Sequence, residues 1–239
     1  MFNSIYFTQN GKTYNMPDYF SHVIIADRIL EKLDKQHRSL IDDRYLYLLG
    51  AQGGDVFFAY NLKLNKTNLG RRLHTIPADK LFTELDCTNP SYCAGYATHY
   101  ALDCTLHPAI YAFENEKKSP VAHFNFESDL GLYISRKYAT PRKILPREAV
   151  IGATFTVYDC IKKVDDSITL TGIERCLKRH FTYTKYIYKN KKQTYKYDYD
   201  YSSLAGSISD AIDLGVKAVK CVLNRDIAAE IFDKQFLQK

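Results

Sequence analysis

Histidine is unevenly distributed along this 239-residue sequence. Five of the seven histidines are candidate metal ligands: His22, His74, His99, His107 and His123. His37 lies in a charged Lys-Gln-His-Arg context typical of a solvated surface, and only His180 follows His123. Neutral imidazole is the usual nitrogen ligand of zinc. The distribution therefore indicates metal chemistry in the first half of the chain.

The spacing of these histidines relative to carboxylates is more informative than their number. His99, Asp103 and His107 follow one another at intervals of four residues, and His123 precedes Glu127 by the same interval. On an α-helix each step of four advances about 40° around the axis, so such residues share one face. Two facing helices with pairs of this kind are a common way to build a metal site inside a helical bundle.

The alternative is that each histidine is a hydrogen-bonded core or surface residue without a ligand. Two histidine–carboxylate pairs on adjacent predicted helices weaken that alternative, and so do His22, His74 and the carboxylate of Asp55 after a glycine-rich loop. The residues around the pairs are mostly apolar or aromatic, and charged groups buried among them are costly unless they pair or bind metal. We therefore expect an interior metal site.

Helix signals predict the elements that must position these side chains. Proline and capping residues start most of the predicted segments. The predicted helices are one opened by Met16-Pro17-Asp18 and running to Leu33, one from Ser39 with Asp42 in a capping box, one from Pro77, one from Asn89-Pro90 to about His107 where Pro108 interrupts it, one from Ser119-Pro120, one from Pro146 to Ile161, and two near residues 168–177 and 204–223. Few alternating strand patterns and no repeat are found. We predict an all-α, multi-helix bundle with a metal cluster in its interior, formed by a single domain over residues 16–239 after an N-terminal extension, residues 1–15.

Composition restricts the class of protein only broadly. Hydrophobic residues make up 46% and charged residues 25%, as in ordinary globular proteins, and no run of 18 apolar residues predicts a transmembrane segment. The N-terminus lacks the pattern of a secretory signal, so we expect a cytoplasmic location. The net charge of +6 is compatible with anionic partners without requiring them. The six cysteines form no Cys-x-x-Cys pair and are expected to be reduced and buried.

These motifs resemble the zinc-dependent phospholipase C family, whose superfamily also contains the single-strand-specific zinc nucleases. The resemblance is carried by Met16-Pro17-Asp18-Tyr19-Phe20-Ser21-His22, the segment Gly50-Ala51-Gln52-Gly53-Gly54-Asp55-Val56-Phe57-Phe58, His74, the segment Gly95–Asp103, His107-Pro108 and His123-Phe124-Asn125-Phe126-Glu127. It implies an all-helical, phospholipase C-like fold with zinc as cofactor, in two or three ions. By position, Asp55, His74, His99 and Asp103 would hold one zinc, His107, His123 and Glu127 a second, and His22 a third, with Asp103 as a bridge.

The sequence departs from the family pattern in two places. In secreted members the N-terminal amine and carbonyl complete the third site, whereas residues 1–15 precede the family-like start at Met16 here. The third site could be missing, use water, or use Asp18, although an acid in the first turn of a helix is the favoured interpretation of Asp18. The interval from Asp103 to His107 is also shorter than in the secreted enzymes, but it preserves one helical face.

The expected activity is hydrolysis of a phosphoric ester by a zinc-activated water that attacks phosphorus. The resemblance suggests Asp55 as the catalytic residue that ligates zinc and orients or deprotonates the water. The substrate would be a phosphate ester, with phospholipid and peripheral membrane contact as one option and nucleic acid as a less favoured one. A nuclease or small-molecule phosphodiesterase on the same site, and a zinc-binding protein without turnover, remain alternatives. Phe57, Phe58 and Tyr60 could form an apolar approach to the site, but packing in the core is favoured.

The segment Tyr183–Tyr201 has an unusual composition, with tyrosine alternating with lysine and later with aspartate. Such residues suit a membrane interface or a nucleic-acid stacking surface. A surface hairpin or an extended helix end with amphipathic side chains is the favoured interpretation.

Overall fold

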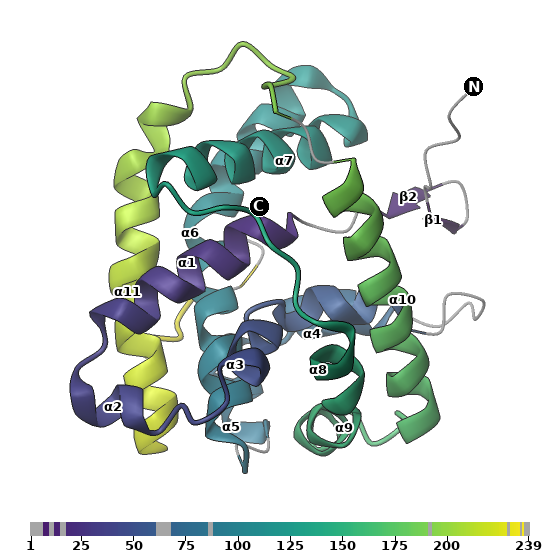
Figure 1. Ribbon diagram of the computed structural model, residues 1–239, viewed down its shortest axis with the longest axis vertical. Coiled ribbons are helices and arrows are strands. Elements are labelled where there is room, and N and C mark those ends of the chain that lie inside the picture. Colours follow the sequence, from purple (N-terminus) through teal and green to yellow (C-terminus); the bar gives the residue numbers. More distant parts are fainter. Residues whose placement is uncertain are drawn as a thin grey trace.

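The computed structural model shows a bundle of helices (Figure 1). It describes residues 18–60, 68–85, 88–190, 193–228, 230–234 and 236, together with two strands near the N-terminus. The helices are α1 (Tyr19–Lys32), α2 (Lys35–Ser39), α3 (Arg44–Gly50), the 3-10 helix η1 (Gly53–Ala59), α4 (Leu69–Thr75), α5 (Ala78–Glu84), α6 (Pro90–Lys117), α7 (Pro120–Lys137), α8 (Arg147–Gly152), α9 (Thr154–Lys162), α10 (Leu170–Lys189), the 3-10 helix η2 (Tyr201–Leu204) and α11 (Ala205–Asn224). The predicted all-α fold class is confirmed.

The two strands form a small antiparallel hairpin outside the bundle. Strands β1 (Phe7–Gln9) and β2 (Lys12–Tyr14) pair with Phe7 opposite Tyr14. The other residues of the predicted extension over 1–15 lie outside the described part of the chain. Within the described residues, none of the helices combines the length and apolar character needed to cross a bilayer.

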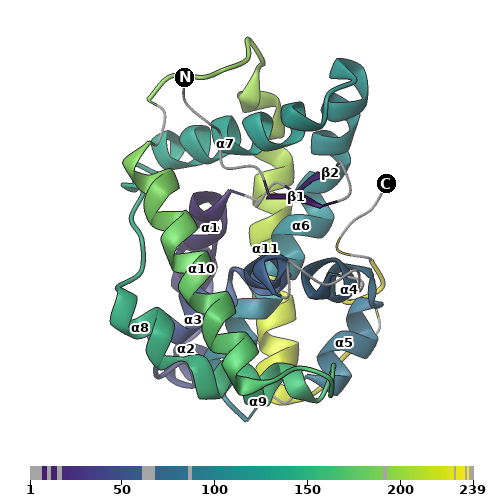
Figure 2. The same ribbon diagram turned by 90° about the vertical axis from the view of Figure 1, so that its right-hand side faces the viewer.

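Helix α6 is the centre of the packing. It contacts α11 along much of its length and also packs against α1, α3 and α7. The two perpendicular views show α7 across one end of the bundle and α10 along the side away from α11 (Figures 1 and 2). The apolar core draws on residues from Tyr19 to Phe236, so helices distant in sequence share one interior. A side chain on the inner face of α6 is therefore enclosed by several elements.

Helix α6 does not end at Pro108, contrary to the sequence-based prediction. It continues to Lys117 with Pro108 on an exposed position inside it. Proline in a helix interior removes one backbone hydrogen bond and costs about 3 kcal/mol. Packing of the following turns offsets this cost, because Ile110 and Phe113 are both buried. The extra turns bring Glu114 and the ring of Tyr111 beside His123 of helix α7.

Other helices also differ from the prediction, and the helix predicted near residues 168–177 is α10, which continues to Lys189. Ser39 ends helix α2 instead of starting a helix, and Asp43 caps α3 by accepting hydrogen bonds from the backbone N–H groups of Tyr45 and Leu46. The segment predicted as one helix from Pro146 divides at Ala153 into α8 and α9. Helix α4 was not predicted at all. At α2 and α3, local capping by Asp34 and Asp43 decides the boundary against the longer periodic pattern.

The tyrosine-rich segment is largely accounted for by packing. The buried carboxylate of Asp129 on α7 accepts hydrogen bonds from the backbone N–H groups of Lys196 and Tyr197 and from the hydroxyl of Tyr201. The ring of Tyr199 contacts Phe126 with centroids 4.8 Å apart. Residues 183–189 continue helix α10, whereas residues 191 and 192 lie outside the described part. Much of the segment is thus anchored to the bundle.

His180 on α10 is a buried residue outside the metal-ligand pattern. Its ring packs near Tyr19, and neither ring nitrogen has a hydrogen-bond partner among the described residues. Burial lowers the pKa of His180 to about 4 from its ordinary value of 6.5. Between these two values the unfolded chain binds a proton that the folded chain does not. Stability contributed by neutral His180 is therefore lost as the pH falls through this window.

We predict that His180→Leu reduces the acid sensitivity of the fold. Wild-type protein should lose up to about 3 kcal/mol more unfolding free energy than the variant between pH 7 and pH 4, because a shift of one pKa unit corresponds to about 1.4 kcal/mol. Urea unfolding at both pH values measures this difference. Equal losses in the two proteins would show that His180 does not titrate on unfolding.

Candidate metal centre

The structure brings all eight predicted ligand residues into one buried region. Five elements supply them: α1, η1, α4, α6 and α7. They form three groups, each with ligand atoms within 4.8 Å of one another and each able to hold a metal ion: a first group of Asp55, His74 and His99, a second group of His107, His123 and Glu127, and a third group of His22, His99 and Asp103. Seven of the eight residues are buried, and His123 is partly exposed. This convergence follows from packing of separate helices around α6.

The first group lies between η1, α4 and α6. The Nε2 atom of His74 is 3.2 Å from Oδ1 of Asp55 and 3.5 Å from Oδ2 of Asp103. The Nε2 atom of His99 is 3.1 Å from Nε2 of His74 and 3.2 Å from Oδ2 of Asp103. Asp55, His74 and His99 therefore form one compact group, and the carboxylate of Asp103 adjoins it through His74 and His99. These are the four residues that the resemblance assigns to the first zinc.

The glycine-rich turn before Asp55 is required for this close approach. A Cβ atom on Gly53 would lie 2.0 Å from the ring of His99, and one on Gly54 would lie 2.4 Å from the ring of His74. Gly53 also has a φ of +45°, a conformation that glycine adopts without the steric cost of a side chain. The two glycines let the backbone of η1 pack directly on the imidazoles, which places Asp55 between them.

Backbone carbonyl groups orient two of the imidazoles. The Nδ1–H of His74 donates to the carbonyl of Gly70 at 2.6 Å, and that of His107 donates to the carbonyl of Asp103 at 3.0 Å. These bonds leave Nε2 of each ring free as the electron-pair donor, which is the arrangement that metal-bound histidines require. In His74 this nitrogen faces the carboxylates of Asp55 and Asp103.

The second group spans α6 and α7. The Nε2 atom of His123 is 3.1 Å from Oε1 of Glu127, and Nε2 of His107 is 3.8 Å from the same oxygen. The ring of Tyr111, one turn after His107, lies 5.5 Å from His107 and 5.3 Å from His123. Burial lowers the pKa of His123, but Glu127 and Glu114 outweigh it and raise the value to about 9. This group is the most open of the three, because His123 is only partly buried.

His22 enters from α1 on the other side of Asp103. Its Nε2 atom is 3.6 Å from Oδ1 of Asp103 and 3.7 Å from Oδ2 of Asp55. Its Nδ1 atom is 3.3 Å from Nδ1 of His99. His22 thus shares Asp103 with the first group, as the resemblance implied for a third site.

The protonation energetics of the cluster favour a bound cation. Burial raises the pKa values of Asp55 and Asp103, lowers that of His22 to about 3 and holds that of His99 well below its usual range. At His74 burial also acts downward, but the carboxylates of Asp103 and Asp55 outweigh it and raise the pKa to about 10. Positive charge is therefore favourable at the position where His74 meets the carboxylates. A divalent cation would supply this positive charge and would also accept electron pairs from the ligand atoms that face one another.

The donor set fits zinc. Buried Oδ1 of Asp55 and Oδ2 of Asp103 have no hydrogen-bond partner among the described residues. Imidazole nitrogens combined with carboxylate oxygens are ordinary ligands of zinc. The described cysteines are free thiols outside the three groups, and Cys87 lies outside the described residues.

The aromatic residues after Asp55 do not form an open apolar approach. Phe57 and Tyr60 are buried in the core, and the hydroxyl of Tyr60 accepts a hydrogen bond from the backbone N–H of Thr169. Phe58 stacks on the ring of His74 with centroids 5.3 Å apart. The prediction that these residues pack in the core is confirmed for Phe57 and Tyr60. Phe58 instead packs against the imidazole of the candidate ligand His74.

Glu114 is a site residue that the sequence analysis missed. Its Oε2 atom lies 2.8 Å from Nδ1 of His123, so the carboxylate accepts a hydrogen bond from that ring. A carboxylate behind a ligand imidazole fixes the ring orientation and increases its basicity. Glu114 follows His107 by seven residues, which is two helical turns on the same face, but the predicted end at Pro108 removed it from consideration.

We predict that Glu114→Ala weakens metal binding at the second group by about 10–100-fold, the range typical for loss of such a supporting residue. Glu114→Gln keeps an acceptor oxygen and should lose less. Competition titration of zinc against a chromophoric chelator measures both affinities. The matched control is Glu116→Ala, because Glu116 is exposed on the same helix and pairs with Lys117. Equal affinities in Glu114→Ala and Glu116→Ala would contradict a role for Glu114.

Comparison with known proteins agrees with the geometry. Residues 21–220 match a family described as zinc dependent phospholipase C, and this range contains all eight candidate ligands. No curated protein and no solved structure matches the chain significantly. Because the family match covers most of the sequence and the imidazoles and carboxylates of that range converge in the interior, the chain belongs to the zinc-dependent phospholipase C family.

Proposed function

We propose that the protein is a zinc-dependent phosphodiesterase of the phospholipase C type. The observation that carries this proposal is the convergence of three ligand groups within the family-matched range. The first group would hold one zinc, the second group another, and His22 with Asp103 would contribute to a third. Bound zinc ions would polarise phosphoryl oxygens and lower the pKa of a water toward neutrality.

The residues of the centre would divide the work as follows. The imidazoles would bind the zinc ions without adding charge. The carboxylates of Asp55, Asp103 and Glu127 would offset only part of the positive charge of two or three zinc ions, so the site would attract an anionic phosphate diester. Asp55 has a buried oxygen, Oδ1, without a hydrogen-bond partner among the described residues. We assign to Asp55 the orientation of the attacking water and acceptance of its proton.

The proposed reaction is hydrolysis of one phosphorus–oxygen bond. The water oxygen bonds to phosphorus as the bond to the alcohol breaks, and the proton taken from water is returned to the leaving alkoxide. On a phospholipid the products would be a diacylglycerol and a phosphorylated head group. Each residue named above binds, orients or moves a proton, and none forms a covalent bond with the substrate.

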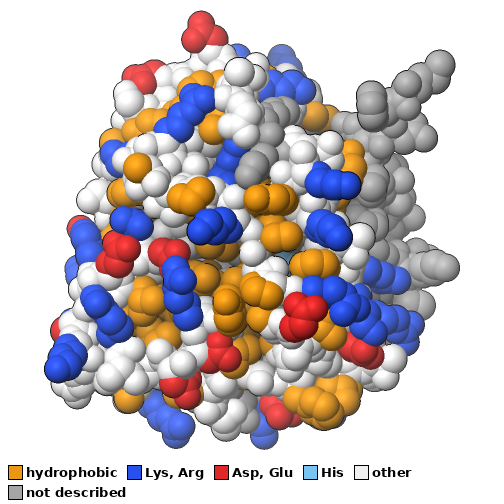
Figure 3. Space-filling model, viewed as in Figure 1, with side chains coloured by type: hydrophobic (Ala, Val, Ile, Leu, Met, Phe, Trp, Pro, Cys, Tyr) orange, Lys and Arg blue, Asp and Glu red, His pale blue; other side chains and the backbone are white. Residues whose placement is uncertain are grey.

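The surface is compatible with a lipid substrate. On the face drawn in Figure 3, hydrophobic side chains gather in the middle, and Lys and Arg side chains lie among and around them. Large exposed hydrophobic residues include Tyr186 and Tyr195, and the guanidinium of Arg136 lies 5.0 Å from the ring of Tyr195. Aromatic and cationic side chains together suit contact with lipid head groups. We therefore favour a phospholipid over a small soluble diester.

We predict that the zinc-loaded protein releases phosphorylated head groups from phosphatidylcholine or phosphatidylethanolamine vesicles, and that Asp55→Asn lowers kcat/KM by about 10²–10⁴-fold, as expected for loss of a general base. Head-group release is followed by phosphorus NMR or chromatography. The control is Asp79→Asn, an exposed aspartate on α5, which should retain wild-type activity.

Two outcomes would contradict the phospholipase proposal. Cleavage of single-stranded DNA or RNA, without release from lipids, would assign the same centre to a nuclease. Stoichiometric zinc without hydrolysis of lipid, nucleic acid or small diesters would indicate a zinc-binding protein without turnover.

A further inference from the structure

Helix α10 carries an excess of positive charge. Its 20 residues include five basic side chains and a single acid, Glu174, so its net charge is +4, against +6 for the whole chain. Helix α11 has the same length but balances two aspartates with two lysines. The excess is therefore not a general property of the long helices of this bundle.

The basic residues of α10 lie on one side of the helix. At about 100° per residue, their positions fall within roughly 120° of the helix circumference, and the buried residues of α10 occupy the opposite side. Figure 2 shows α10 on the outside of the bundle, where this side faces solvent. We call the exposed residues on it the basic stripe: Arg175, Lys178, Arg179, Lys185, Tyr186 and Lys189.

The protein neutralises only part of the basic stripe. Lys178 pairs with Glu174 at 2.5 Å, and the guanidinium of Arg179 donates to a backbone carbonyl at the end of η1. Like charges three or four residues apart on a helix are unfavourable, so an anionic partner would stabilise the stripe. Three of its cations form no ion pair with any residue that the structure describes: Arg175, Lys185 and Lys189.

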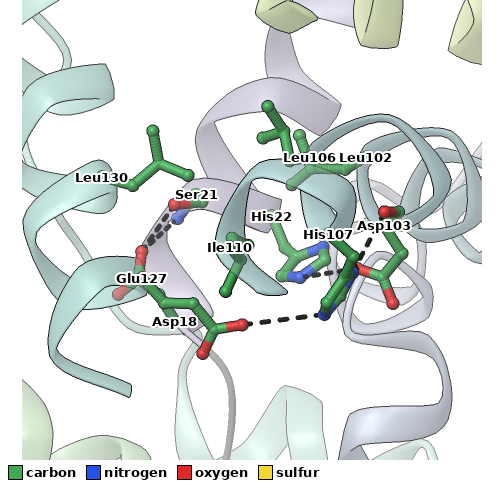
Figure 4. A pocket seen from close by; sticks show the side chains of 10 residues that line it. All are labelled: Asp18, Ser21, His22, Leu102, Asp103, Leu106, His107, Ile110, Glu127 and Leu130. Atoms are coloured by element: carbon green, nitrogen blue, oxygen red, sulfur yellow. Dashed lines mark hydrogen bonds and ion pairs between the residues drawn. The ribbon is translucent and has the colours of Figure 1, made fainter. Parts of the chain in front are cut away.

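The cavity at the metal centre is too small to hold a lipid chain. It lies beside Asp18, is lined also by His22, Asp103 and His107, and has a volume of about 20 Å³, enough for about one water molecule (Figure 4). A lipid is therefore not retained there by its acyl chains. An enzyme that acts on lipids through this centre needs another part of its surface to remain at the bilayer.

We propose that the basic stripe of α10 docks the protein on a bilayer that contains anionic phospholipid. Charged groups on flexible stems suit a layer of anionic head groups, and Tyr186, which is 41% exposed, suits the interface between head groups and water. The choice of a lipid partner rests on the function proposed above. Single-stranded nucleic acid is less suited, because it binds to several aromatic platforms and the stripe offers one exposed ring. The docking lipid would thus differ from the zwitterionic lipid proposed as substrate.

The test is binding of the zinc-loaded full chain to vesicles of phosphatidylcholine alone and of phosphatidylcholine mixed with phosphatidylserine, measured by co-sedimentation. Wild type should bind the mixed vesicles more tightly, and high salt should remove the difference because it screens exposed charges. The triple variant Arg175→Gln, Lys185→Gln and Lys189→Gln should bind the mixed vesicles about 100-fold more weakly, at about 1 kcal/mol for each basic side chain near an anionic surface.

The matched control is the triple variant Lys35→Gln, Lys80→Gln and Lys217→Gln, which removes exposed lysines from α2, α5 and α11. It changes the net charge by the same amount and should keep the affinity of wild type. Melting temperatures measured by circular dichroism verify that both variants fold. The dependence of wild-type binding on salt and on phosphatidylserine tests the inference without any variant.

Equal affinity of wild type for the two kinds of vesicle would overturn the inference, as would equal losses in the stripe and control variants. Binding to single-stranded RNA that the stripe variant loses, without a preference for anionic vesicles, would overturn it in favour of nucleic acid. Head-group release is measured in the same samples. Stripe-dependent docking without release would refute only the proposed function, whereas release without stripe-dependent docking would refute only this inference.

Discussion

The structure depends on one constraint, which is the burial of carboxylates whose negative charge must be balanced inside the bundle. The carboxylates of Asp55 and Asp103 lie 3.2 and 3.5 Å from Nε2 of His74, whose ring is held on its opposite side by Gly70, and they raise the pKa of His74 to about 10. Such an arrangement is unfavourable in a low-dielectric interior unless a positive charge occupies it. The surrounding helices must therefore be stable enough to hold the ligands together. A centre formed in this way is preorganised for a cation, since little rearrangement accompanies binding.

Helix α6 meets this requirement by acting as a rigid axis. It carries His99, Asp103 and His107 on one face and contacts α1, α3, α7 and α11 around its circumference. The continuation of α6 past Pro108 also positions the site, because the following turns place Tyr111 and Glu114 against the rings of the second group. Side chains on a regular helix are positioned more accurately than those on loops. The single ligand from outside an α-helix, Asp55, lies in a 3-10 turn whose glycines pack directly on the imidazoles.

The features that were predictable from sequence are those set by local periodicity. Intervals of four residues identified the ligand faces of α6 and α7, because helix geometry alone puts such residues together. The predicted end at Pro108 was wrong, since tertiary packing of α6 outweighs the local cost of proline. Glu114 and the cavity beside Asp18 depend on how α7 and α1 meet α6, and helix contacts between distant segments leave no signal in spacing. The anchoring of the tyrosine-rich segment by Asp129 is another contact of this kind.

The C-terminal segment extends the influence of the centre to the end of the chain. The ring of Phe236 lies 5.8 Å from that of His74 and 5.9 Å from that of His99, and Tyr100 fixes the segment by donating to the carbonyl of Ile231. Ligands from α1 to α7 and a ring from residue 236 thus share one packed cluster. A cation that binds only the folded form stabilises every element that its ligands hold in place. Metal binding and the integrity of segments more than two hundred residues apart are therefore linked through the orientation of two imidazoles.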